Sequence, residues 1–400
     1  MTPFEVIGAQ QCLQDNLIAS NSGNILFAYS VYKSLSARGV DIDVNRYKIK
    51  ALDADEISEK YDAFVIPLAN AFRRSYSAKL DALTDVIKRM KIPCVVVGVG
   101  AQTNLEHSIM GGSPMDASVK GFVSAVLDRS ASIGVRGEFT RDYLKKLGFS
   151  SVDVIGCPSM YLNGGSLEVR KSPGISKDSN IAVNLTRGMT PPVCDLFRRT
   201  WKEYKGVTYV AQDMDDFKYI YAGKHIDGIR KRDAFPRRTN HPLYTGNKIK
   251  LFFNVSSWLK SMGGMDFSFG TRIHGNIFAL LAGVPAVVIA HDSRTLELAK
   301  FFQIPYVLSS DIDDKTSPES IYQMADFDAM SAGHRDRFNG YIRFLSKNSL
   351  PSIYADDTAV AEFEARVGAL DFPGAVTPIT SCGKSEMRER LAFIHEHVNF

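Results

Sequence analysis

The hydrophobic positions of the chain alternate between helical spacing and short continuous runs. In the first part of the chain, helical spacing covers residues 24–38, 78–90, 116–128 and 138–147, and apolar runs typical of strands cover 40–44, 63–66, 93–99, 132–135 and 152–155. Gly148 follows the last of these helices, where glycine commonly ends a helix. Such a succession of strands and helices is typical of a parallel sheet that is covered on both faces.

The pattern lapses once and then resumes. Residues 163–179 are rich in Gly, Ser, Pro and Lys, as is typical of a linker. Strands are then expected at 180–185 and 207–211 around a helix at 192–204, and helix, strand, helix and strand follow over 254–290. We therefore predict an α/β fold with two Rossmann-like doubly wound domains, residues 1–170 and 171–330, and a helical C-terminal extension over 331–400.

Composition narrows the class of protein. The chain has 400 residues, of which 45% are hydrophobic and 23% charged, as in soluble globular proteins with room for two cores. Its net charge of +4 is too mild to indicate nucleic-acid binding. The five cysteines are scattered and form no C-x-x-C pair, so they indicate neither a zinc site nor a disulfide framework, but reduced thiols.

Two features bear on localisation. The N-terminus lacks the apolar region of a signal peptide, and the longest apolar run, 277–290, is too short to span a bilayer. We expect a cytoplasmic protein that meets a membrane, if at all, peripherally at its inner face. The segment 214–250 looks irregular and basic, and either a solvated loop or a contact for an anionic acceptor or lipid headgroup fits it; its basic residues are Arg230, Lys231, Arg232, Arg237 and Arg238.

Two polar side chains open a stretch that otherwise looks buried. Arg272 and His274 fall between a short strand at 267–269 and a helix that Gly283 ends, so they lie at a strand-to-helix turn. Free N–H groups at such a turn favour an anion, a guanidinium reinforces the binding, and an imidazole can exchange protons there. A helix cap that also forms an interdomain salt bridge is the simpler alternative, although the strand–turn–helix setting favours the anion.

Four segments in order resemble motifs of the polysaccharide pyruvyl transferase family. The segment "GTRIHGNIFALLAGVPAVVIAHDSRTLELAKFFQIP", from Gly270, resembles its Arg-Leu-His-Gly element, apolar helix, Gly-Val-Pro and polar turn. "VVVGVGAQT" (95–103), "ASIGVRGEFTRDYLKKLG" (131–148) and "VIGCPSMYL" (154–162) resemble its Gly-x-Gly-Ala-Gln, Val-Arg-Asp and Cys-Pro-Ser segments. The resemblance extends over roughly residues 21–306.

The resemblance implies a GT-B-like architecture, with the acceptor on the N-terminal domain and the donor on the C-terminal domain. It implies phosphoenolpyruvate as co-substrate, with no further cofactor, and a pyruvate ketal on a sugar diol as product. We expect no metal, because His291 and His334 have no metal-ligand partners at useful spacing. The partner would be a saccharide or lipid-linked saccharide, and a homo-oligomer is compatible with the sequence. Family donor-binding positions correspond to Arg136 and to Arg272, Ile273 and His274.

The chemistry of the donor fits these residues. Phosphoenolpyruvate carries a carboxylate and a phosphate, and burying both requires strong cationic partners. We expect Arg136 and Arg272, from opposite domains, to supply them and His274 to protonate the methylene carbon, which makes these three the catalytic candidates. Arg187 and Gly275 complete the predicted donor site, with a solvated role as the alternative for Arg187.

The acceptor site is expected on loops that follow the strands. Its candidates are Asn21, Asn24, Asn70, Gln102, Asn104 and Asp292, each with a local structural alternative: a helix cap for Asn24 and a surface turn for Asp292.

The chain departs from the family pattern at three places. Gly137 stands where Asp is common, residues 291–294 read His-Asp-Ser-Arg instead of Tyr-Asp-x-Lys, and "SNSGN" replaces a Gly/Asp-rich turn. These departures leave the acceptor sugar open. A glycosyltransferase that uses a nucleotide sugar is the alternative enzyme, although Glu297 alone represents the pair of glutamates that retaining members often carry near the donor. The third alternative is a catalytically inactive homologue that acts as a scaffold.

Overall fold

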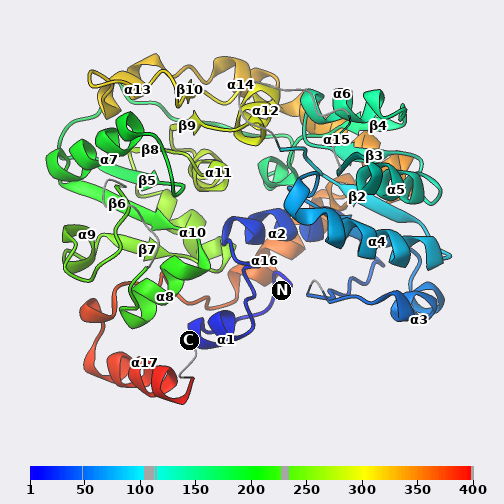
Figure 1. Cartoon of the computed structure of the whole chain (residues 1–400), viewed down its shortest axis with the longest axis horizontal. Helices are drawn as coiled ribbons and strands as arrows, with labels where there is room; N and C mark the ends of the chain where they lie inside the picture. Colours follow the sequence, from blue (N-terminus) through cyan, green and yellow to red (C-terminus); the bar gives the residue numbers. More distant parts are fainter. Residues whose placement is uncertain (47, 103–111, 113–114, 227–233, 398–400) are drawn as a thin grey trace.

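A computed structural model describes residues 1–46, 48–102, 112, 115–226 and 234–397, and it arranges them in two α/β lobes (Figure 1). The C-terminal lobe carries a six-stranded sheet in which all neighbouring strands are parallel, in the order β10-β9-β8-β5-β6-β7. Its strands are β5 (Asn180–Asn184), β6 (Gly206–Ala211), β7 (Ile249–Leu251), β8 (Phe267–Gly270), β9 (Ala286–Ala290) and β10 (Tyr306–Leu308). This is the Rossmann strand order. Strands β6 and β7 are added on one side of β5, and β8, β9 and β10 follow on its other side, so the strand order reverses between β5 and β8.

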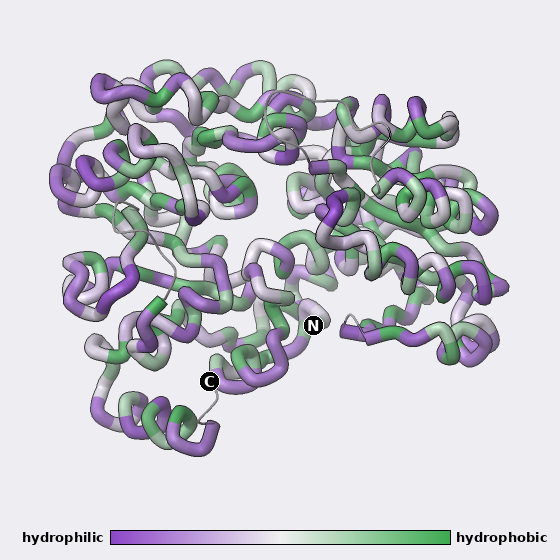
Figure 2. Tube along the Cα trace, viewed as in Figure 1, coloured by the Kyte–Doolittle hydropathy of each residue, from purple (hydrophilic) through white to green (hydrophobic). Residues whose placement is uncertain are grey.

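The N-terminal lobe has a smaller parallel sheet. Strand β1 (Phe64–Pro67) pairs with β2 (Cys94–Val97), and β3 (Ile133–Val135) pairs with β4 (Val152–Val154). A parallel bridge between Val99 and Val135 connects the two pairs. The helices of this lobe are α3 (Ala54–Lys60), α4 (Ser77–Arg89), α5 (Met115–Leu127) and α6 (Glu138–Lys146). Apolar segments gather along the strands of both lobes, and hydrophilic residues mark the outer helices (Figure 2).

Helices flank the C-terminal sheet in the predicted alternation. They are α7 (Pro191–Glu203), α8 (Met214–Ala222), α9 (Pro242–Thr245), α10 (Val255–Met262), α11 (Ile273–Leu281), α12 (Ser293–Phe302), α13 (Pro318–Met324) and α14 (Asp328–Ala332). Trp258 of α10 stacks on Phe278 of α11 with ring centroids 3.8 Å apart, and both side chains are buried. The predicted α/β class is confirmed, with a parallel sheet in each lobe and a Rossmann-like strand order in the C-terminal lobe.

The helical C-terminal region touches both lobes (Figure 1). Helix α15 (His334–Lys347) returns to the N-terminal lobe, where Tyr341 stacks on Tyr161. Helix α16 (Asp357–Gly368) lies against α2 (Gly23–Leu35), since Glu364 forms an ion pair with the buried Lys33. Helix α17 (Lys384–Glu396) lies against α8. The division of the chain at residues 170 and 330 stays a prediction.

Two expectations about local structure were wrong. Residues 40–44 form no strand, because they pair with no strand among the described residues. The segment 214–250 is not irregular throughout, because α8, α9 and β7 lie in it and aromatic side chains of α8 are buried. Arg230, Lys231 and Arg232 lie outside the described residues. Within the described parts of the chain, no helix is long and apolar enough to cross a membrane.

Candidate functional site

The site is built on the strand ends next to β5 and β8, from which successive strands are added toward opposite edges of the C-terminal sheet. In open parallel sheets, ligands bind in the crevice at this point. The Asn184 side chain, at the end of β5, accepts a hydrogen bond from the backbone N–H of Arg272 (2.7 Å) and donates to Asn276 (3.1 Å). A Cβ atom at Gly275 would lie 2.7 Å from Nε2 of Gln212, so the glycine lets polar side chains approach the start of α11.

His274 lies where both lobes and α2 meet. Any side chain at Gly23, the first residue of α2, would press on the imidazole, and the Cys157 sulfur lies 3.8 Å from its Nε2. Burial, assisted by the charges of Arg136 and Arg294, lowers the pKa of His274 to about 3. The imidazole is therefore neutral at pH 7 in the unliganded site.

Arg136 enters the same region from the N-terminal lobe. It follows β3, its backbone N–H donates to the carbonyl of Val99 (2.9 Å), and only 3% of the residue is exposed. Its Nε and Nη2 have no hydrogen-bond partner among the described residues. Burial lowers the pKa of this guanidinium, which the Cys157 sulfur partly opposes. Buried, unsatisfied donors on a cation favour an anionic ligand.

Arg272 and Arg187 lie at the strand ends of the C-terminal sheet, but both have carboxylate partners. Arg272 forms an ion pair with Asp213, and Arg187 donates to Asp215 (2.6 Å) and Asp216 (3.3 Å). Burial, together with the neighbouring Asp213, raises the pKa of Asp216 to about 6. The structure thus brings Arg136 to His274, and it groups Arg272 with Arg187 around three aspartates.

A chain of hydrogen bonds joins predicted acceptor residues across the lobes. Asn70, which follows β1, donates to Gln102 (2.9 Å), and Gln102 donates to Asp292 of the other lobe (3.5 Å). Asp292 accepts from Nε of Arg294 (2.8 Å) and caps α12 through the backbone N–H of Thr295 (2.9 Å). Asp292 is thus a buried helix cap, not a surface turn.

The other acceptor candidates have local partners or cannot be placed. Asn21 accepts from the backbone N–H of Gly23 (2.9 Å). Asn24 is not the cap of α2, because its side-chain amide donates to the carbonyls of Ile18 (3.3 Å) and Ala19 (3.2 Å). Asn104 lies outside the described residues.

Sequence reasoning missed Glu297 as a contact between the lobes. Its carboxylate accepts from the backbone N–H (2.7 Å) and the hydroxyl (3.0 Å) of Thr140, in the first turn of α6. Burial raises the pKa of Glu297 to about 7. Any side chain at Gly137 would overlap Glu297, so this contact accounts for the glycine where the family has aspartate.

Arg294 and Arg73 were also not predicted. Arg294 pairs with Asp292, and its charge lowers the pKa of His291, where burial is the largest cause. Arg73, on the loop after β1, has a buried Nε without a partner among the described residues, and its pKa is lowered by burial and by Arg294. The resemblance of residues 291–294 to an Asp-x-Lys turn was the available signal for Arg294. For Arg73, the sequence contained no such signal.

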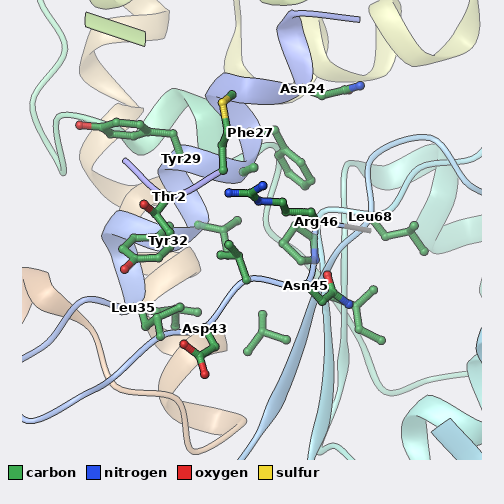
Figure 3. A pocket seen from close by; sticks show the side chains of 18 of the residues that line it. Thr2, Asn24, Phe27, Tyr29, Tyr32, Leu35, Asp43, Asn45, Arg46 and Leu68 are labelled. Atoms are coloured by element: carbon green, nitrogen blue, oxygen red, sulfur yellow. The ribbon is translucent and has the colours of Figure 1, made fainter. Parts of the chain in front are cut away.

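A large cavity adjoins these residues. Its volume is about 2520 Å³, and its lining includes Asn21, Asn24, Asn70, Arg73 and Arg294. Figure 3 shows side chains that line it, among them Phe27, Tyr29 and Tyr32 of α2, with the Arg46 side chain beside Phe27 and with Asn45 and Asp43 nearby. Arg136, Arg272 and His274 do not line it. Among the described residues, no three His, Cys, Asp or Glu side chains group to hold a metal ion.

Comparisons with known proteins give one family and several distant structures. The model of a family described as polysaccharide pyruvyl transferase matches residues 21–293. A comparison with curated proteins gave no match. Among solved structures, S. aureus MnaA with UDP is 14% identical (84% of each chain covered, TM-score 0.36). A putative UDP-N-acetylglucosamine 2-epimerase from Listeria monocytogenes is 11% identical (81% and 79% covered, TM-score 0.39).

Proposed function

Because this chain belongs to the polysaccharide pyruvyl transferase family, we propose that it transfers pyruvate from phosphoenolpyruvate to a diol of a saccharide, forming a pyruvate ketal and releasing phosphate. The observation that carries the proposal is Arg136, a buried guanidinium next to a neutral imidazole, whose Nε and Nη2 have no partner among the described residues. A small donor with a carboxylate and a phosphate would satisfy those donors.

Donor binding would also prepare His274 for its role. In the free protein, burial and the two nearby guanidiniums disfavour the imidazolium. A bound trianion would offset those positive charges and raise the pKa of His274, so the imidazole could take up a proton as the donor enters. His274 would then give this proton to the methylene carbon, and C2 would become electrophilic.

The ketal then forms in two additions. One sugar hydroxyl attacks C2 and loses its proton, and the second hydroxyl displaces phosphate from the same carbon and also loses its proton. Of the two protons released, one restores His274 for the next turnover and the other leaves with phosphate or solvent. Arg136 would hold the charge of the donor throughout, with Arg272 and Arg187 available once their carboxylates yield.

The acceptor would lie against the hydrogen-bond chain formed by Asn70, Gln102 and Asp292. Burial acts to raise the pKa of Asp292, but Arg294, His291 and the backbone N–H of Thr295 together outweigh it, and the pKa is lowered. A carboxylate held this way is a weak base, so we assign it the positioning of Arg294 and Gln102 rather than deprotonation. A cytoplasmic location at the membrane face, a lipid-linked acceptor and a homo-oligomer stay predictions.

Phosphate release tests the proposal. The protein is incubated with phosphoenolpyruvate and a panel of free sugars and oligosaccharides, and inorganic phosphate is followed. We expect release that depends on the saccharide and falls sharply in His274→Gln. Thermal stabilisation by UDP-sugars but not by phosphoenolpyruvate would contradict the proposal and favour a nucleotide-sugar enzyme.

A further inference from the structure

The two groups proposed to meet the donor lie on different lobes. Arg136 follows β3 of the N-terminal lobe, and His274 lies in the first turn of α11 in the C-terminal lobe. Packing within either lobe does not fix the distance between them. That distance depends on the contacts that join the lobes, so a residue that makes such a contact can control the donor site without touching the donor.

Helix α12 of the C-terminal lobe makes two of these contacts. It lies beside α6 of the N-terminal lobe (Figure 1). At its start, Asp292 accepts a hydrogen bond from Gln102 (3.5 Å). Further along the helix, the buried carboxylate of Glu297 accepts from the backbone N–H (2.7 Å) and the hydroxyl (3.0 Å) of Thr140. The Glu297 contact has the shorter distances, and it reaches the segment that carries Arg136.

Glu297 caps α6 from the opposite lobe. A helix usually receives this cap from the residue before its first turn, whose side-chain oxygen accepts from the second or third N–H of the helix. That residue is Gly137, which has no side chain to offer, and Thr140 is the third residue of α6. A Cβ atom at Gly137 would lie 2.2 Å from Cγ of Glu297, so Glu297 occupies the place of the missing cap. Parting the lobes would therefore leave the helix uncapped.

The capped end of α6 also surrounds Arg136, which directly precedes the N-cap position. The Thr140 hydroxyl that donates to Glu297 accepts from the backbone N–H of Ala101 (3.0 Å), in the loop after β2. A Cβ atom at Gly100 of this loop would lie 3.1 Å from Cδ of Arg136, so the arginine side chain lies against the loop. Through Thr140, Glu297 thus holds both segments between which Arg136 lies.

We propose that Glu297 is a positioning residue that holds Arg136 and His274 in register for the donor by joining the lobes at the start of α6. The inference rests on the proposed function, which assigns those two residues to phosphoenolpyruvate. Glu297 is not itself a donor ligand, since it acts through Thr140 and the loop after β2. Without this link the lobes would part. Because the donor needs both lobes, its affinity would fall in proportion to the fraction of molecules that stays closed.

Three variants separate the link between the lobes from the cap of α6. Glu297→Ala removes both, and Glu297→Gln keeps both, because an amide can bond to the N–H and the hydroxyl of Thr140 without a charge. Gly137→Asp combined with Glu297→Ala supplies a cap from within the N-terminal lobe and leaves the lobes unlinked. The backbone at Gly137 is extended, so aspartate fits it. The matched control is Glu138→Ala, an exposed carboxylate in the same turn that pairs with Arg141 of its own helix.

Donor affinity and stability are then measured on the full chain by calorimetry with phosphoenolpyruvate and by thermal unfolding. We expect affinity to fall about tenfold in Glu297→Ala and in the double variant. The thermal midpoint should fall in Glu297→Ala and partly recover in the double variant, because only the cap is restored. Glu297→Gln and Glu138→Ala should bind the donor like the wild type.

Three outcomes would overturn the proposal. Affinity that recovers together with the midpoint in the double variant would make Glu297 a helix cap and nothing more. Unchanged affinity in Glu297→Ala would remove any role in donor binding. An equal loss in Glu297→Gln and Glu297→Ala would assign the effect to the charge of the carboxylate and not to the link.

A distance between the lobes keeps this test apart from the proposed function. Spin labels at Lys88→Cys on α4 and Lys202→Cys on α7, two exposed positions, report the separation of the lobes without any donor. Cys382→Ser serves as background, since the other four cysteines are buried. We expect a narrow distance distribution in the wild type, Glu297→Gln and Glu138→Ala, and a broader one in Glu297→Ala and the double variant. Equal distributions in all five proteins would overturn the link. If they differ but the wild type does not bind phosphoenolpyruvate, the link stands and the proposed function fails.

Discussion

The cleft holds two groups of arginines that differ in their partners. Arg136 is buried, and two of its side-chain nitrogens have no partner among the described residues. Arg272 and Arg187 are equally well placed at strand ends, but Asp213, Asp215 and Asp216 already bind them. The difference teaches that an arginine at an anion-binding position is not by itself a vacant anion site. The first group is prepared for a ligand, and the second must exchange one partner for another.

The largest expected effect is the loss of activity in Arg136→Met. This change removes a cation whose Nε and Nη2 have no partner in the described part of the chain, and it keeps most of the side-chain volume, so saccharide-dependent phosphate release should fall by about 10²–10³-fold. Arg187→Met should cost markedly less, since its charge is already offset by two aspartates. Steady-state kinetics with phosphoenolpyruvate as the varied substrate compare them. Equal losses in the two variants would remove the distinction between the two groups.

The next effect is on catalysis by His274. In His274→Gln the proton donor is lost while Arg136 remains, so turnover should fall by about 10²-fold or more with little change in phosphoenolpyruvate affinity. Single-turnover phosphate release and calorimetric binding give the two quantities. A large loss of affinity with unchanged turnover would show that the imidazole binds the donor and does not protonate it.

Proton uptake on donor binding is a second test of the role of His274. The pKa of His274 is about 3 in the free site, so the imidazole is unprotonated at pH 6–8. If the donor raises this pKa, binding takes up a proton and affinity rises as the pH falls. Calorimetry in two buffers of different ionisation enthalpy should show net uptake in the wild type and less in His274→Gln. The same uptake in both proteins would assign the proton to another group.

Stability should change with opposite signs in the two groups. Arg136→Met removes a buried cation with unsatisfied donors, so the thermal midpoint should rise. Arg272→Met leaves the part-buried Asp213 without its ion-pair partner, so the free energy of unfolding should fall by about 1–2 kcal/mol. Thermal and urea unfolding measure both. A fall in both variants would mean that Arg136 is satisfied in the free protein.

The smallest effect concerns Glu297, which joins the lobes beside Arg136. Burial raises its pKa from 4.5 to about 7, so the folded state binds more protons than the unfolded state between these values. Its contribution to stability is therefore present below about pH 4.5 and is lost as the pH rises through about 7. Glu297→Gln should flatten the pH dependence of the thermal midpoint between pH 5 and 8. An unchanged slope would assign the dependence to other groups.

The features that the sequence predicted are those whose signals lie within a few consecutive residues. The turn that carries Arg272 and His274 was predicted because a strand, a glycine turn and a helix succeed one another within a few residues. Residues 40–44 have the alternation of a strand, but a strand needs a neighbour, and no local pattern reports that none is present. The partners that divide the arginines come from far along the chain, such as Asp213 for Arg272, so they could not be read from spacing.

A structure with phosphoenolpyruvate bound tests the central claim most directly. The account predicts the carboxylate or the phosphate within hydrogen-bond distance of Nε or Nη2 of Arg136, with the methylene carbon facing the His274 imidazole. Phosphoenolpyruvate bound between Arg187 and Arg272, with the Arg136 guanidinium still unpartnered, would contradict it.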